Sequence, residues 1–463
     1  MRILRISFTQ TRALGIACAV VSIAASQLLT ALAVAGPPTK PPLASSDVAI
    51  LVPLKANIEV DSVFKSTGTG LCNAIQFNGV NGGILSQSQF EAFAKQVFGR
   101  GDDGRCNSDS SAQGGGDDAT VLSRNPASHL ARARGLPGRA CNFAAWRVVG
   151  FRYEPCFERP GKTFKSRADL ASCTPEARLV AQPWNTEGTP FPDDLAMHLI
   201  FRVPNPDALV SDLFSFAETT RTATKGNSWD EFDAKPDVLR PHPGLRGEMQ
   251  RCDGPVSVAY RALLARHTNS TLLRQVAFMT SSTAQVQWTF GAMNFSGGSF
   301  SPLTDRAGDK FDNFSGDIFN FGSSFPFNAS LKLATFLQTA KFFTNDLLMN
   351  PGDLSPAANK QAADLSADLN ALEHPVRVGQ GASNCISCHM VAQTRSELTN
   401  HGVMPSSAGT YTRVTLWPPF DDAVRSTFNF RNFGYGPSFE MGVSRRTANE
   451  TDDVRQTINA IYR

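Results

Sequence analysis

Three residues near the C-terminus have types and spacing that suit redox chemistry. Two residues separate Cys385 from Cys388, and His389 follows directly. Two thiols at this spacing can add across the two vinyl groups of a haem, and an imidazole beside the second thiol can reach the iron from one face. The chain has only seven histidines, so a histidine beside such a pair is improbable by chance. The spacing therefore predicts one covalently attached haem c with His389 as an iron ligand.

Two other chemistries use a pair of cysteines at this spacing. A zinc site needs four ligands. Cys385, Cys388 and His401 match the first three ligands of a Cys₂His₂ site, but residues 405–407 are Pro, Ser and Ser and supply no fourth. A redox-active dithiol normally follows a strand, whereas residues 379–384 show no strand pattern. Haem attachment is therefore the favoured interpretation.

At this motif the chain resembles the c-type cytochrome family. The resemblance covers about residues 350–463, and its specific part is the motif itself together with a predicted C-terminal helix. It implies that Cys385 and Cys388 form the thioether bonds and that His389 is the proximal iron ligand. It also implies a small helical domain around a single haem.

The resemblance leaves the sixth iron ligand to a later residue. In compact soluble cytochromes a methionine shortly before the terminal helix supplies this ligand, and Met441 stands in the matching place. Met404, which precedes a proline, is the first alternative. A second histidine, His374 or His401, would give a bis-histidine site, and a site open on one face is the remaining option.

The first residues have the layout of an export signal. Arg2, Arg5 and Arg12 precede an apolar stretch without charges that runs to Ala35, with small residues at the expected cleavage site. The stretch is long enough to span a bilayer if it is not cleaved. We therefore expect a periplasmic or secreted protein, with membrane anchoring as the alternative.

The charge balance argues against a nucleic-acid binder. The chain carries 44 Lys and Arg against 41 Asp and Glu, and the leader contains three arginines but no acidic residue. The mature chain is thus electrically balanced and lacks the basic footprint of proteins that bind nucleic acids or coat anionic membranes.

Six cysteines remain after the leader and the haem motif are set aside. In an oxidising compartment an even number suggests disulfides. A pairing of Cys141 with Cys156 is disfavoured, because an extended strand over residues 146–153 would hold the two too far apart. The six are Cys72, Cys106, Cys141, Cys156, Cys173 and Cys252.

The pattern along the chain predicts a multidomain α+β protein with a large β-rich N-terminal region and a small α-helical cytochrome c-like domain. Residues 36–330 form the β-rich region of unknown role, as a sandwich or a barrel, and residues 331–463 form the helical haem domain. Strands are expected at residues 47–53, 146–153, 178–182, 195–203 and within 273–295. Helices are expected at residues 87–98, 206–216, 331–348, 357–372 and 449–462, the last with Asn449 as its N-cap.

These features favour an electron carrier with an unidentified redox partner protein. One alternative is a haem-dependent or haem-fused periplasmic oxidoreductase, in which the β-rich region binds a substrate. Another is a secreted binding protein with an appended redox domain. The chain contains no nucleophile elbow, dinucleotide fingerprint or phosphate loop, so no catalytic residue is assigned. His198 and His242 are interpreted as structural.

Overall fold

The computed structural model describes much of the β-rich region and several shorter pieces of the C-terminal part. The chain divides into two units, Met1–Pro41 with Arg463 and Pro42–Tyr462, and the account below concerns the second. The described residues are 40–54, 74–97, 138–156, 164–185, 191–193, 195–223, 236–247, 253–282, 286–302, 318–321, 369–375, 391, 433–436 and 441–463.

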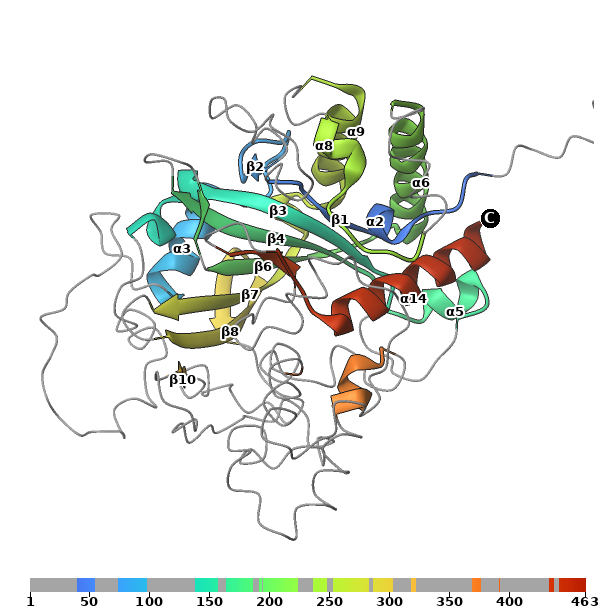
Figure 1. Ribbon diagram of the computed structural model, residues 1–463. Coiled ribbons are helices and arrows are strands. Elements are labelled where there is room, and N and C mark those ends of the chain that lie inside the picture. Colours follow the sequence, from blue (N-terminus) through green and yellow to red (C-terminus); the bar gives the residue numbers. More distant parts are fainter. Residues whose placement is uncertain are drawn as a thin grey trace, which may run out of the picture. The chain divides into compact units, whose positions relative to one another are not determined.

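Among these residues, ten strands form one antiparallel sheet (Figure 1). Its main path runs β1-β3-β4-β6-β7-β8-β10, while β2 pairs with β3, β5 with β4 and β9 with β8. The strands are β1 (Ala49–Leu51), β2 (Ile75–Gln76), β3 (Trp146–Glu154), β4 (Glu176–Asn185), β5 (Phe191–Pro192), β6 (Ala196–Arg202), β7 (Leu273–Ser282), β8 (Val286–Ser296), β9 (Ser299–Pro302) and β10 (Ile318–Phe321). A separate hairpin joins β11 (Phe433–Tyr435) to β12 (Met441–Val443).

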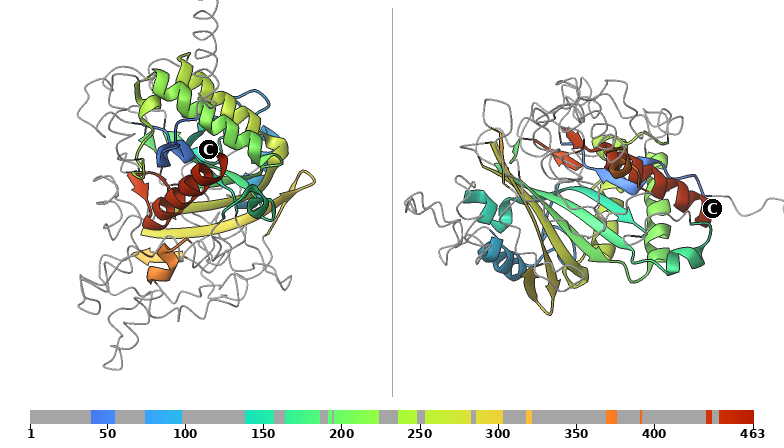
Figure 2. Two further views of the ribbon diagram at one scale, coloured as in Figure 1. Left: turned by 90° about the vertical axis from the view of Figure 1, so that its right-hand side faces the viewer. Right: turned by 90° about the horizontal axis from the view of Figure 1, so that it is seen from below.

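Helices surround this sheet. Helices α6, α8 and α9 pack together beside it, and α14 lies next to α2 (Figure 2). The helices are α2 (Ser45–Val48), α3 (Gln87–Val97), α5 (Arg167–Ala171), α6 (Pro206–Ala223), α8 (Pro243–Gly247), α9 (Pro255–His267) and α14 (Arg445–Tyr462), with short 3₁₀ turns at Gly138–Cys141, Phe143–Ala145 and Ser270–Leu272. Residues 369–373 are also helical.

The two faces of the sheet differ in chemistry, because side chains alternate along each strand. One face is apolar and includes Trp146, whose ring packs against Phe77 and Phe90 of the α3 region. The opposite face carries Arg152 and Arg178, which are cross-strand neighbours on β3 and β4. This polar face is the one that α14 and the β11–β12 hairpin contact.

The described C-terminal pieces belong to the same hydrophobic core as the sheet. Leu372, Val391, Phe433 and Ile458 are buried in the cluster that includes the strand residues. Residues 376–390 and 392–432 lie outside the described part. A mixed α+β fold is therefore confirmed, while a separate cytochrome-like domain over 331–463 remains a prediction.

Most of the expected elements in the described residues are present, with two corrections. The region expected as a strand at residues 47–53 begins as the helical turn α2, because Asp47 accepts a hydrogen bond from the Ala44 N–H and closes a turn. Asn449 is not an N-cap: α14 begins at Arg445, and the Asn449 side chain instead donates to the Glu373 carbonyl. The expected helix at 331–348 lies outside the described residues, and the helix expected at 357–372 is described only from residue 369, where residues 369–373 are helical.

One disulfide joins Cys156 to Cys173 and closes the connection between β3 and β4. This agrees with the expectation that Cys141 and Cys156 do not pair, since the strand from Trp146 to Glu154 does separate them. Cys141 is also disulfide-bonded. The cysteines at 72, 106 and 252 lie outside the described residues.

Candidate functional site

The predicted haem ligands fall largely outside the described residues. Cys385, Cys388 and His389 do so, as do the alternative ligands Met404 and His401. The described residues on either side of the motif are 369–375, Val391 and the β11–β12 hairpin with α14. These pieces are the described residues that flank the motif in sequence.

Met441, the expected sixth ligand, is the first residue of β12. Its backbone is paired with that of Tyr435 across the hairpin. Tyr435 is in turn fixed to the sheet: its N–H donates to Gln182 Oε1 at 2.9 Å, its carbonyl accepts from Gln182 Nε2 at 2.6 Å, and its hydroxyl donates to the Val52 carbonyl at 2.7 Å. Burial raises the pKa of the Tyr435 hydroxyl far above its ordinary value, so this group remains a donor. The backbone of Met441 is therefore joined to the sheet through Tyr435.

A glycine on β3 makes room for this hairpin. A Cβ atom at Gly150 would lie 2.5 Å from Cε1 and 2.9 Å from Cδ1 of Phe433. Both residues are buried. The absence of a side chain at Gly150 thus allows the ring of Phe433 to lie directly against the polar face of the sheet.

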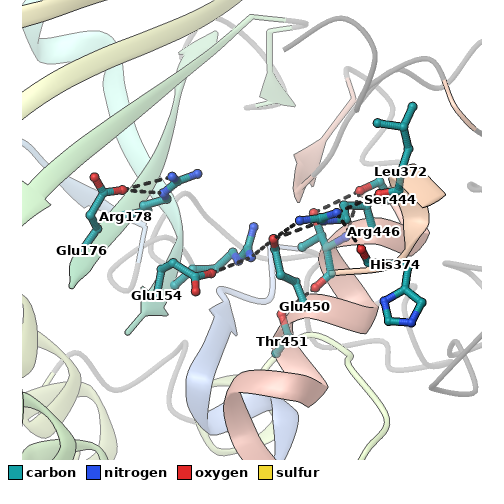
Figure 3. Close-up of polar contacts among 11 residues, drawn as sticks. Glu154, Glu176, Arg178, Leu372, His374, Ser444, Arg446, Glu450 and Thr451 are labelled. Carbon is teal, nitrogen blue, oxygen red and sulfur yellow. Dashed lines mark hydrogen bonds and ion pairs between the residues drawn. The ribbon is translucent and has the colours of Figure 1, made fainter. Parts of the chain in front are cut away.

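The segment before the motif is held by α14. Arg446 Nη1 donates to the Leu372 carbonyl at 2.9 Å and to the His374 carbonyl at 3.3 Å. Asn449 Nδ2 donates to the Glu373 carbonyl at 3.0 Å. Carbonyls at the end of a helix lack partners within that helix, and α14 supplies partners to these three. His374 itself is half-buried, and its imidazole points away from Arg446 (Figure 3).

A buried chain of ion pairs connects this segment to the sheet (Figure 3). Arg446 donates to Glu450 Oε1 at 2.7 Å through Nη2 and at 3.1 Å through Nε. The other oxygen of Glu450 accepts from Arg152 Nη2 at 2.8 Å. That same nitrogen lies 4.0 Å from Glu154 Oε2. All four side chains are at most 11% exposed.

The pKa values of the two carboxylates in this chain of ion pairs are shifted in opposite directions. Burial alone would raise the pKa of Glu450, but the adjacent guanidinium groups of Arg446 and Arg152 outweigh burial and lower the pKa to about 2. Burial is the main cause that raises the pKa of Glu154 to about 8, and the negative charge of Glu450 adds to it against the partial compensation by Arg152 and Arg178. Glu450 is therefore ionised at neutral pH, and Glu154 favours its protonated form.

A second group of charges continues along the polar face. Glu176 on β4 accepts from Arg178 Nη2 at 3.0 Å and, through its other oxygen, from Arg274 Nη1 on β7 at 2.7 Å. Glu176 is fully buried, whereas the Arg274 side chain is 30% exposed. The polar face thus carries an alternating series of basic and acidic groups from β7 to α14.

The two histidines interpreted as structural have different surroundings. His242 is fully buried, with Nε2 3.7 Å from Asp47 Oδ1 and its ring 4.9 Å from that of Phe216. Burial lowers the pKa of His242, so it is neutral at physiological pH. Asp47 also binds Arg221 at 3.3 Å. His198 lies half-buried in the middle of β6.

Sequence reasoning did not find the ion-pair chain, although one local signal exists. Arg446 and Glu450 are four positions apart, which is the spacing of paired charges on one helix face. Such a pair usually lies on a solvated face. Here the Arg446–Glu450 pair is buried and also contacts Arg152. Arg152 lies far away in the sequence, so no local pattern indicates this contact.

Comparisons place the chain in no known group. No family model, no curated protein and no solved structure matches it significantly.

Among the residues that the structure describes, no three His, Cys, Asp or Glu side chains gather in the arrangement of a metal site. None of the described helices combines the length and apolar character needed to cross a bilayer.

Proposed function

We propose that this protein is an exported c-type cytochrome that transfers electrons, with one haem attached through Cys385 and Cys388 and with His389 as the proximal iron ligand. The observation that carries the proposal is the spacing of these three residues. The arginine-containing leader supports it independently, because covalent haem attachment requires export in the bacterial pathway that such leaders serve.

The arrangement of the flanking pieces suits an electron carrier. A bound haem supplies a one-electron couple, and the protein supplies ligands, burial and surface. The carbonyls of Leu372 and Glu373 before the motif are bound by α14, and Tyr435 after it is bound to the sheet, all through buried hydrogen bonds. Anchoring on helices and strands holds a site in one geometry. A haem that only gains and loses electrons needs such a fixed geometry.

Met441 is the proposed sixth ligand, because it stands shortly before the terminal helix and its backbone is paired with Tyr435, which is hydrogen-bonded to the sheet. Met404, His374 and His401 remain the alternative ligands. A methionine ligand raises the reduction potential of a haem relative to other ligands. We expect M441A to lower the midpoint potential markedly, and M404A and H374A to leave it near the wild-type value. An unchanged midpoint potential in M441A would exclude Met441 as the sixth ligand.

Electron transfer itself is tested by redox titration of the purified holoprotein. We expect a reversible one-electron transition and rapid electron exchange with a small soluble mediator. An enzyme would instead reduce or oxidise a small molecule with turnover that saturates with its concentration. Saturable turnover that requires residues of the β-rich region would contradict the proposal of a simple carrier.

A further inference from the structure

The polar face of the sheet contains a pair of carboxylates that compete for one cation. Glu450 and Glu154 both approach Nη2 of Arg152, at 2.8 Å and 4.0 Å. Glu450 has a second guanidinium, that of Arg446, at 2.7 Å. Of the contacts among Arg152, Arg446 and these two carboxylates, the shorter ones go to Glu450 and the longest to Glu154, whose side chain is only 8% exposed. Two buried carboxylates around one cation are a setting in which one carboxylate binds a proton.

Among the described residues, the charged groups around Glu154 lie on three elements. On its own strand, β3, the charged group is Arg152, while the neighbouring Tyr153 is uncharged because burial raises the pKa of its hydroxyl far above its ordinary value. The groups on β4 and α14 are Glu176, Arg178, Glu450 and Arg446. Arg178 is held by Glu176 at 3.0 Å, so its charge is already shared. The positive charge near Glu154 is thus divided among three carboxylates.

We propose that Glu154, beside Arg152 and Glu450, is a proton-binding site coupled through Arg446 to the chain segment that leads to the predicted haem. The path consists of direct contacts: Glu154 to Arg152, Arg152 to Glu450, Glu450 to Arg446, and Arg446 to the carbonyls of Leu372 and His374. A short stretch of chain then leads from His374 to Cys385. The coupling to haem rests on the proposed function, whereas the proton site itself does not.

The consequence is that, at a pH where Glu154 is ionised before reduction, one electron and one proton enter together. An electron from a one-electron donor adds a negative charge to the protein, and a proton from water binds to the carboxylate of Glu154, where an O–H bond forms. The net charge of the protein is then unchanged. Above about pH 8, where Glu154 is ionised in the oxidised protein, reduction is accompanied by proton uptake. The midpoint potential then falls as pH rises, by at most about 59 mV for each tenfold change in proton concentration.

The proton site is tested without reference to haem. Infrared spectra of the folded protein report the C=O stretch of a protonated carboxyl group. We expect wild type to show this band at about pH 6 and to lose it above about pH 9, and E154Q to lack the titrating band. E218Q, which makes the same change at an exposed position of α6, is the control and keeps it. A titrating band that persists in E154Q would overturn the assignment.

The coupling is tested by the pH dependence of the midpoint potential of the holoprotein. Above about pH 8 we expect a slope in wild type and E218Q, a loss of that slope in E154Q, and a smaller slope in R446K. R455K is the control for R446K, because Arg455 lies on the same helix and binds Asp452, not residues 372–374. Equal slopes in E154Q and wild type would refute the coupling. A chain that binds no haem but shows the infrared band would refute the proposed function and leave the proton site standing.

A folding control keeps these tests decisive. Glutamine has the size and hydrogen-bonding groups of a protonated glutamate, so E154Q is expected to fold as wild type does, which circular dichroism checks. Should R446K fail to fold, N449A removes the neighbouring contact to the Glu373 carbonyl. A wild-type slope in N449A would show that the coupling does not depend on the Asn449 contact, and an unchanged slope in E154Q would still refute the coupling itself.

Discussion

Arg152 on β3 donates a 2.8 Å hydrogen bond to Glu450 on α14, although 298 positions separate the two residues. This contact joins a strand on the main path of the sheet to the last helix of the chain. It also brings the segment before the predicted haem motif into the same buried network, because Arg446 links Glu450 to residues 372–374. The β-rich region and the described C-terminal pieces are therefore parts of one core.

Loss of Arg152 should destabilise the protein strongly. Removing one partner of a buried ion pair leaves an uncompensated charge and costs about 3–5 kcal/mol. We expect R152M to lower the free energy of unfolding by this amount in urea denaturation. R266M removes an exposed arginine bound to Asp212 and should cost about 1 kcal/mol or less. Equal losses of unfolding free energy in the two variants would show that the buried ion pair contributes no more to stability than the exposed one.

The stability should depend on pH in opposite directions through Glu450 and Glu154. The lowered pKa of Glu450 contributes stability above its ordinary value of 4.5 that is lost as pH falls toward 2. The raised pKa of Glu154 contributes stability below pH 4.5 that is lost as pH rises through about 8. We expect E154Q to become progressively more stable relative to wild type between about pH 5 and pH 8. A difference that is constant over this range would contradict the raised pKa.

A side chain at position 150 should disturb the hairpin that carries Met441. The added Cβ in G150A would collide with the ring of Phe433, and overpacking of this kind costs about 1–3 kcal/mol. We expect G150A and F433L each to reduce stability and the double variant to lose less than the sum, because the smaller side chain relieves the collision. Additive losses of unfolding free energy would show that the two residues do not contact each other.

Removal of the Cys156–Cys173 disulfide should reduce stability moderately. The bridge closes a loop between residues 17 positions apart, and loops of this length are stabilised by about 3 kcal/mol. We expect C156S/C173S to lower the urea midpoint without changing the midpoint potential, since the bridge is not part of the contacts that hold residues 372–374. A changed potential would indicate that the bridge lies closer to the redox site than these contacts suggest.

Local patterns predicted much of the fold. Strands at residues 146–153, 178–182 and 195–203 match β3, β4 and β6, and the helix expected at residues 87–98 matches α3. These elements have the alternation or helical spacing that their own sequence specifies. The helix α9 was not expected, because its apolar residues are interrupted by Ser257, Arg261 and Arg266.

Long-range contacts could not be predicted in the same way. Arg152 and Glu154 alternate with Phe151 and Tyr153, which is the pattern of a strand with one solvated face. That face is buried because α14 and the hairpin cover it. The same reason explains the error at Asn449. A residue of a type that caps helices, followed by acidic residues, resembles a helix start. In the structure its side chain instead donates to the carbonyl of Glu373, 76 positions earlier in the chain.

The central claim is covalent haem, and the pyridine haemochrome spectrum of the denatured chain tests it most directly. The protein is exported from cells that contain the haem-maturation machinery, beside a C385A/C388A variant. We predict a c-type band that stays with the denatured wild-type chain and is absent from the variant. A properly exported and folded wild-type chain without this band would contradict the account.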